Sequence, residues 1–194
     1  MTPAQITRIQ SKIKKYRALL ASERTKFGCY DDSGGRRYKI LELYISIADY
    51  NKALVYLRWF FKNFPDDGGF PFFWVEACLT YFHNNKLAEA RTMAFKVFTS
   101  NPYIWEVFFT GTATKVIGIK PSSNWEDSSL ALHLPYRASQ QPYFEFAEFL
   151  KTTLAEPNMQ GLIKQYFELK LKLAATPVGT ERSLLVKRLS ELKA

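Results

Sequence analysis

The segment from Gly35 to Pro102 repeats itself at an offset of 37 residues. Laid on itself at this offset, the segment matches at four landmark positions, which are Tyr44 with Tyr81, Ala53 with Ala90, Phe61 with Phe98 and Pro65 with Pro102. A period of about 20 to 50 residues is typical of solenoid proteins, in which each repeat buries its apolar face against its neighbours. The segment is therefore expected to form two stacked helical hairpins.

The second copy carries the clearer motif. Trp74 is followed by Ala77, Cys78 and Tyr81, then by Ala90 and finally by Pro102. This order resembles the tetratricopeptide repeat (TPR), whose consensus is W-x2-L-G-x2-Y, then A-x3-F, then P over about 34 residues. The resemblance spans roughly residues 35–110, and the stretches YDDSGGRRY and YLRWFFKNFPDD are also reminiscent of uncharacterised bacterial proteins of this type. It implies an all-α superhelix of antiparallel hairpins that binds a protein or a peptide.

Apolar periodicity and prolines set the expected helices of the repeats. Repeat one, residues 35–65, is predicted to form helices from Arg36 to Ala48 and from about Lys52 to Phe64. Repeat two, residues 71–102, is predicted to form helices from Pro71 to about Asn84 and from Lys86 to Thr99. Pro65 and Pro102 end the hairpins because proline does not continue a helix.

The period fails after Pro102. Tyr103 to about Thr110 resembles the first helix of a degenerate third unit, and residues 111–141 suggest only one short helix, near Glu126 to His133. Further helices are expected to begin at Pro142 and Pro157, and a last one to be capped by Thr180. The sequence thus predicts an all-α chain in three regions: an N-terminal capping helix at 1–27, repeats at 28–110, and a helical extension at 111–194 packed on the repeats.

The N-terminal helix has one apolar stripe. Thr2 and Pro3 are suited to start it, and its apolar residues recur at three- and four-residue steps as Ile6, Ile9, Ile13, Tyr16 and Leu20. Such a helix is expected to cover the open end of the repeat stack. A coiled-coil dimer seam and a nucleic-acid-binding helix are the two alternatives.

Positive charge is concentrated in the terminal helices. The net charge is +9, of which residues 1–27 contribute +6 and residues 164–194 contribute +4, which leaves −1 for the rest. Any attraction to nucleic acid would therefore come from the two ends of the chain. Two cysteines, no signal-peptide pattern and no long apolar run predict a reduced, cytoplasmic setting without a membrane span. The oligomeric state stays open.

Similar loops precede the two repeats. They are rich in aspartate and glycine, and they suggest a loop edge made of Asp31, Asp32, Arg36, Arg37, Asp66 and Asp67. Equivalent loops of a solenoid lie side by side, so these residues are expected to approach for ion pairs or for a shared partner. Helix capping and turn formation are the structural alternative. A calcium site is not expected, because oxygen ligands at the required alternate positions are missing.

The TPR resemblance also implies a groove along the first helix of each repeat. Its expected lining is Tyr38, Glu42, Ile45, Phe72, Val75, Leu79, Phe82 and His83. Such a lining favours an aromatic or apolar anchor. Members of the family that clamp a terminal carboxylate use Lys, Arg and Asn, which this lining lacks. The alternative is that the C-terminal helices fill the groove.

Catalytic and metal-binding patterns are not found in the sequence. His83 and His133 have no partners at zinc-ligand spacing, and no phosphate-binding glycine loop, dinucleotide fingerprint or nucleophile motif occurs. We therefore expect a non-enzymatic scaffold or adaptor without a cofactor, which binds a protein or peptide through the groove or the loop edge. The alternative is a nucleic-acid-associated helical protein that uses the basic terminal helices.

Overall fold

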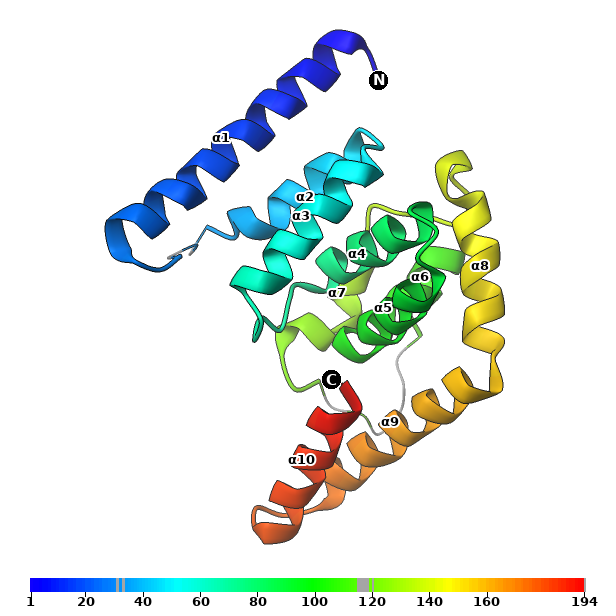
Figure 1. Ribbon diagram of the computed structural model, residues 1–194. Coiled ribbons are helices and arrows are strands. Elements are labelled where there is room, and N and C mark those ends of the chain that lie inside the picture. The colour runs from blue at the N-terminus through cyan, green and yellow to red at the C-terminus, as the bar shows by residue number, and fades with distance from the viewer. Residues whose placement is uncertain (31, 33, 115–118, 120, 194) are drawn as a thin grey trace. The chain divides into compact units, whose positions relative to one another are not determined.

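In the computed structural model, the chain is helical in all of its regular elements. The structure describes residues 1–30, 32, 34–114, 119 and 121–193. These residues form ten α-helices and two short 3-10 helices, with no strand among them (Figure 1). The prediction of an all-α chain is therefore confirmed. The chain divides into two compact units, Met1–Ala90 and Arg91–Ala194, and each is described by itself.

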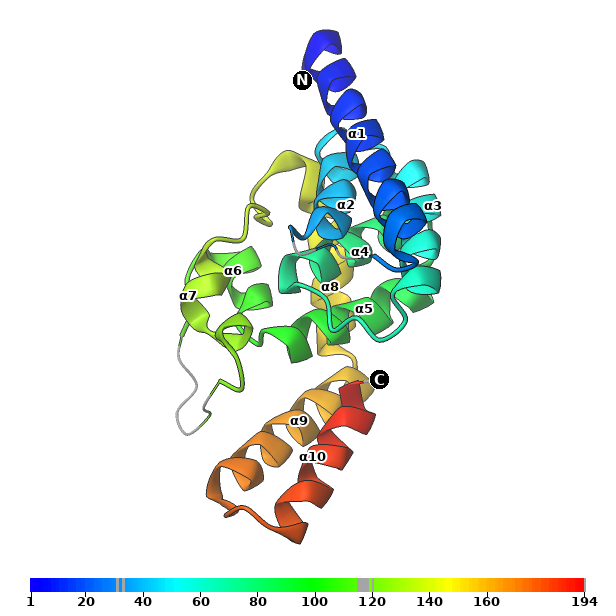
Figure 2. The same ribbon diagram turned by 90° about the vertical axis from the view of Figure 1, so that its left-hand side faces the viewer.

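The first unit begins with α1, Pro3–Phe27. Thr2 and Gln5 form a capping box, in which each side chain bonds the other residue's backbone N–H. Ile13 and Leu20 are buried on the apolar stripe, and α1 lies along α2, Arg36–Ser46, in both ribbon views (Figures 1 and 2). Gly28 ends α1 at φ 71, a left-handed conformation that suits glycine.

Three helices make the core of the first unit. They are α2, α3 at Tyr50–Asn63 and α4 at Pro71–His83, and each packs on the other two. The interface is closed by side chains without exposed surface, among them Ile40, Leu41, Ala53, Leu57, Phe60, Ala77 and Cys78. The Cys78 thiol donates a hydrogen bond to the carbonyl of Ala90 at 3.2 Å. Burial raises the pKa of this thiol. Ala90 belongs to α5, Leu87–Ser100, which begins in this unit.

The 37-residue period is present in the backbone as well as in the sequence. Ala48 and Asn85, 37 residues apart, are the only non-glycine residues at positive φ in the described chain, at 53° and 55°. Within the first turn, the Asp49 N–H donates to Tyr44 O at 3.0 Å, and within the second the Lys86 N–H donates to Tyr81 O at 2.9 Å. The two hairpin turns therefore have the same hydrogen-bonded geometry.

The second unit contains the remaining helices. After α5 come α6 at Ile104–Thr110, the 3-10 turn η1 at Asn124–Glu126, α7 at Ser128–Leu132, η2 at Gln141–Tyr143, α8 at Phe144–Ala155, α9 at Pro157–Ala175 and α10 at Thr180–Lys193. The expected short helix is thus α7, which begins later than predicted because the Asp127 side chain caps it at the N–H of Ser129. Pro142 lies in η2 instead of starting α8. The helices α9 and α10 form an antiparallel pair (Figures 1 and 2).

A largely buried ion cluster joins the two C-terminal helices to residues 122–126. Lys170 of α9 donates to the Glu126 carboxylate and to the Ser122 hydroxyl, both at 2.7 Å, and Lys193 of α10 lies 3.5 Å from the same carboxylate. Burial acts to raise the pKa of Glu126, but the bonds from Lys170 and from the Ser122 N–H lower it below its ordinary value. This one carboxylate therefore ties both C-terminal helices to residues 122–126.

Candidate functional site

The residues expected to line the TPR-like groove do not form one open surface. Val75 and Leu79 have no exposed surface and Ile45 is 4% exposed, so a partner does not reach them in this structure. The physical reason is that α4 is largely apolar on all sides and buried along nearly its whole length, and such helices lie inside a fold. The other expected members, Tyr38, Glu42, Phe72, Phe82 and His83, keep at least partial exposure.

Those accessible residues already contact neighbours. Glu42 pairs with Lys39 at 2.6 Å, which is one turn away on α2. His83 stacks on Tyr50, with ring centroids 3.8 Å apart. That Phe72, Phe82 and His83 receive a partner stays a prediction.

Four residues of the expected loop edge meet at the start of α2. The two carboxylate oxygens of Asp32 accept hydrogen bonds from the backbone N–H groups of Arg36 and Arg37, both at 2.8 Å. The Arg37 guanidinium lies between two carboxylates, 3.2 Å from Asp32 and 2.7 Å from Asp67. Arg36 reaches Glu23 of α1 at 2.9 Å. Of the remaining two expected members, Asp66 is exposed and Asp31 lies outside the described residues.

This loop network is closed on itself. The Tyr38 hydroxyl donates to Asp67 at 2.5 Å and accepts from Arg37 at 3.1 Å, and the N–H of Gly69 also donates to Asp67, at 2.8 Å. Burial, together with the hydrogen bond to Asp67, raises the pKa of Tyr38 to about 12. Asp32, Arg37, Tyr38 and Asp67 are thus paired with one another, which favours a structural role for them, although one oxygen of the Glu23 carboxylate is buried without a hydrogen-bond partner. No cluster of three or more metal-ligating side chains occurs among the described residues.

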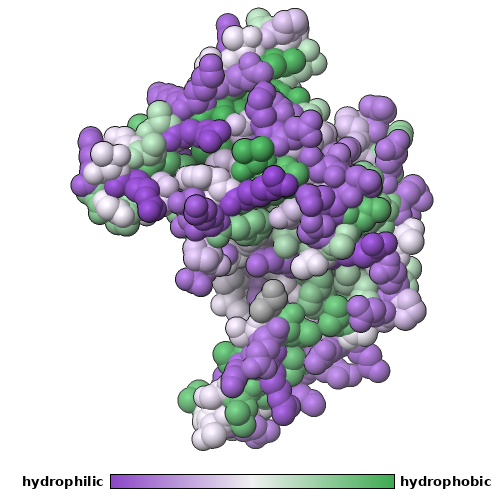
Figure 3. All heavy atoms as spheres, in the orientation of Figure 1, coloured by the Kyte–Doolittle hydropathy of each residue, from purple (hydrophilic) through white to green (hydrophobic). Residues whose placement is uncertain are grey.

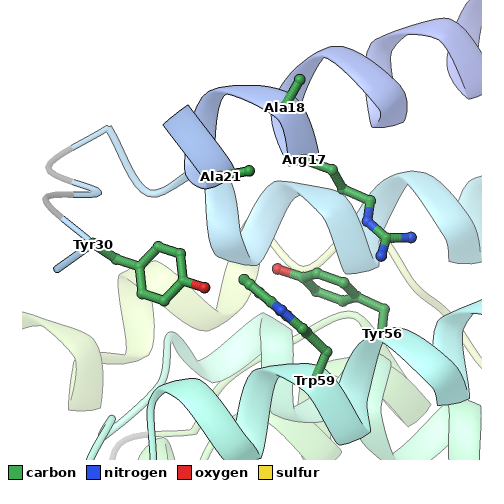
Figure 4. A pocket seen from close by; sticks show the side chains of 6 residues that line it. All are labelled: Arg17, Ala18, Ala21, Tyr30, Tyr56 and Trp59. Atoms are coloured by element: carbon green, nitrogen blue, oxygen red, sulfur yellow. The ribbon is translucent and has the colours of Figure 1, made fainter. Parts of the chain in front are cut away.

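A pocket that the sequence did not indicate lies between α1 and α3. Its volume is about 340 Å³, and it is lined by Arg17, Ala18 and Ala21 of α1, by Tyr30 and by Tyr56 and Trp59 of α3 (Figure 4). The alanine side chains are small and take up little space beside α1, whereas the Arg17 side chain extends from α1 towards the aromatic residues (Figure 4). Among the residues that the structure describes, none of those lining the pocket carries a carboxylate.

The aromatic wall of the pocket is fixed by its own contacts. The Trp59 ring stacks on the Tyr56 ring, with ring centroids 5.3 Å apart. It meets the Tyr30 ring edge-on, with centroids 5.6 Å apart. The Tyr56 hydroxyl donates to Arg37 O at 2.6 Å, and burial raises its pKa. The guanidinium of Arg24 lies over the Tyr30 ring at 5.2 Å from its centroid. The wall is therefore preorganised, with Tyr56 buried and Trp59 partly exposed.

The cations of α1 form two stripes. Residues three, four or seven apart share a helix face, so Lys14, Arg17 and Arg24 follow the pocket side together with Ala21. Arg8, Lys12 and Lys15 form a second stripe at the same spacing. All are exposed, and hydrophilic side chains cover much of the α1 region in Figure 3. The only ion pair of α1 within the described chain is that of Glu23 with Arg36, so both stripes lack carboxylate partners there.

The pocket was missed because its walls come from distant parts of the chain. Arg17 and Trp59 are 42 residues apart in sequence, and Tyr30 belongs to the loop between them. One sequence signal was available: Arg17, Ala21 and Arg24 at i, i+4 and i+7 place a small residue between two cations. That pattern predicts a space beside the helix, but it does not say which residues line the other side.

Comparisons with known proteins add no assignment to this geometry. Neither models of protein families, nor curated proteins, nor solved structures give a match to the chain. Among the described residues, no helix is both long enough and apolar enough to cross a membrane.

Proposed function

We propose that the chain is a non-enzymatic, TPR-like adaptor whose first unit binds an acidic segment of a partner protein. The observation that carries the proposal is the uncompensated positive charge beside the pocket. Lys14, Arg17 and Arg24 follow one face of α1, and α3 has no carboxylate between Tyr50 and Asn63. An anionic partner would supply the missing charge, and complementary charge is what steers and orients partners at interfaces.

A protein partner fits the form of the surface. Grooves between helices receive extended or helical segments, anchored by one or two side chains. The pocket of about 340 Å³ is at the small end of the range for binding sites, which is about 300 to 1,000 Å³. The repeated hairpin turns at Ala48 and Asn85 support the helical-repeat part of the proposal.

Charge removal from each stripe of α1 tests this proposal. The full chain is titrated into a fluorescein-labelled, glutamate-rich peptide, and anisotropy is followed at low and at moderate salt. Replacing Arg17 and Arg24 by alanine is expected to weaken binding about tenfold, which corresponds to about 1.4 kcal/mol. The matched control replaces Arg8 and Lys15, which removes the same charge from the other stripe, and is expected to change affinity less than about threefold.

Two results count against the proposal. Equal weakening by both double variants would mean that net charge alone attracts the peptide, without a defined site. An absence of binding even at low salt, where surface charges are least screened, would remove the function altogether.

The second stripe of α1 favours one further candidate, which is binding of nucleic acid. Arg8, Lys12 and Lys15 form a linear array of exposed cations. Phosphate contacts release counterions, so the affinity for an oligonucleotide should then fall steeply with salt. A nearly flat salt dependence would refute this candidate.

A further inference from the structure

We propose that the α1–α3 pocket holds one aromatic side chain of the partner, and that acidic residues next to this anchor pair with Arg17 and with Lys14 or Arg24. This inference rests on the proposed function, because it names the motif that the adaptor would recognise. The predicted motif is a single Phe, Tyr or Trp flanked by Asp or Glu.

The size of the pocket suits one planar ring. A cavity of about 150 Å³ is enough to hold benzene in a protein interior. The pocket, at about 340 Å³, therefore has space for a phenol or an indole with its attached backbone, but not for a row of rings. Ala18 and Ala21 line the pocket on the α1 side with small side chains, and Tyr30, Tyr56 and Trp59 line the rest of it.

The chemistry of the walls also favours a ring. Trp59 is held between the stacked Tyr56 ring and the edge of Tyr30, so an incoming ring meets a fixed indole. Aromatic pairs gain stability beyond the area that they bury, and they lose little conformational entropy when the wall is already ordered. Aromatic side chains are accordingly enriched among the residues that dominate interface energies.

The charge at the pocket indicates that the partner's residues beside this aromatic ring are acidic and not basic. Arg17 lines the pocket and Arg24 covers the Tyr30 ring at 5.2 Å. A cationic ligand, such as a methylated lysine in an aromatic cage, would be repelled by both guanidinium groups. Carboxylates beside the anchor would instead form charge-assisted hydrogen bonds with them.

An acidic peptide fits these walls better than a single-stranded nucleic acid does. Binding of single strands relies on successive bases that stack on several aromatic side chains along a basic groove. Here Tyr56 is 1% exposed and the Tyr30 ring already contacts Arg24, so Trp59 is the one partly exposed ring of the pocket without such a cation. A single stacking surface matches a single anchor.

Three labelled peptides of equal length test the inference with the full chain. The first has one central Phe among Asp and Glu residues, the second has Ala in place of Phe, and the third keeps Phe but has Lys in place of the acids. Anisotropy titrations are expected to show the first peptide binding at least about tenfold tighter than the second, with no measurable binding of the third.

A pocket-filling variant locates the anchor. Ala21→Phe places a ring in the pocket and is expected to remove the preference for the first peptide over the second. Ser22→Phe is the matched control, because Ser22 is also a small, exposed residue of α1 but does not line the pocket. This control is expected to keep the full preference, and circular dichroism checks that both variants retain the wild-type helix content.

The other outcomes overturn the inference in distinguishable ways. Equal binding of the first two peptides by the wild-type chain would refute the anchor but leave the proposed function standing. If neither acidic peptide binds, both proposals fail. Binding of the lysine peptide would refute the acidic motif, and tighter binding of a single-stranded oligonucleotide that displaces the first peptide would assign the surface to nucleic acid. A preference that survives Ala21→Phe would place the anchor elsewhere.

Discussion

The turns at Ala48 and Asn85 share one backbone geometry, whereas the loops that lead into the two hairpins do not. In each turn a left-handed residue precedes the start of the second helix. The ion pair that follows is reversed in sign: Asp49 pairs with Lys52 at 2.7 Å, and at the equivalent positions Lys86 pairs with Glu89 at 2.9 Å. The repeat is thus preserved in the backbone, while the side chains have changed.

The loops before the two hairpins start their helices in different ways. Both loops place a left-handed glycine just before the helix, Gly35 at φ 62 and Gly69 at φ 67, but Asp32 binds two backbone N–H groups of α2 whereas α4 starts with Pro71 and has no side-chain cap. The starts of α2 and α4 are 35 residues apart, instead of 37. The 37-residue spacing is therefore set inside each hairpin, whereas the loops that precede the hairpins differ in length and in their contacts.

The largest effect is expected at Gly69. A Cβ at this position would lie 2.1 Å from the Trp74 ring, at φ +67, where non-glycine residues are strained. Gly69→Ala is therefore expected to destabilise the fold by about 3 kcal/mol or more, measured by urea unfolding. Gly68→Ala is the control, because its Cβ would meet nothing within 4 Å, and it should cost less than about 1 kcal/mol. Equal effects of the two changes would contradict the described loop.

Substitution of Asp32 is expected to cause the second largest loss of stability. Its carboxylate is buried, accepts two backbone hydrogen bonds and pairs with Arg37. Asp32→Ala is expected to cost about 2 to 4 kcal/mol in urea unfolding, because it removes a helix cap and one of the two partners of a partly buried arginine. Asp66→Ala, at an exposed aspartate of the other loop, should cost less than about 0.5 kcal/mol. A loss at Asp32 as small as that at Asp66 would refute the structural role of the network.

The contribution of the Tyr38 hydroxyl to the stability of the fold is expected to depend on pH. The Tyr38→Phe change removes the hydrogen bond to Asp67 and is expected to cost about 1 to 2 kcal/mol near neutral pH. The folded pKa of about 12 exceeds the unfolded pKa of about 10, so the wild type keeps this stabilisation below pH 10 and loses it as the pH rises towards 12. The stability difference between the two proteins should therefore narrow over that window in urea titrations. A pH-independent difference would contradict the hydrogen bond between the Tyr38 hydroxyl and Asp67.

The smallest effects are expected in the two turns, with opposite signs. Ala48→Gly is expected to stabilise the fold by about 0.5 to 1 kcal/mol, because glycine removes the cost of left-handed alanine. Asn85→Ala should destabilise it by a similar amount, since asparagine tolerates this conformation better than alanine does. Chemical unfolding of both variants checks the pair, and changes of the same sign would show that the two turns are not equivalent.

Sequence reasoning reached the elements that depend on local signals. Prolines and apolar periodicity predicted the helices of the hairpins to within a few residues, because these signals act within one or two turns of helix. The burial of Val75 and Leu79 was expected only under the alternative of a filled groove, because a helix that is apolar all round does not show which face is covered. The pocket could not be predicted from the sequence, because the approach of Arg17, Tyr30 and Trp59 depends on how α1 packs against the hairpin. No local sequence pattern specifies this packing.

Chemical-shift mapping shows directly whether the α1–α3 pocket is the binding site. The ¹⁵N-labelled chain is titrated with the acidic peptide that carries one central Phe. The account predicts the largest shifts at the indole N–H of Trp59 and at the backbone amides of Ala18 and Ala21. The indoles of Trp74 and Trp105, which donate to Gly68 O and Ala94 O, should move least. Shifts centred on Phe72, Phe82 and His83 instead would contradict the account and return the site to the helical groove.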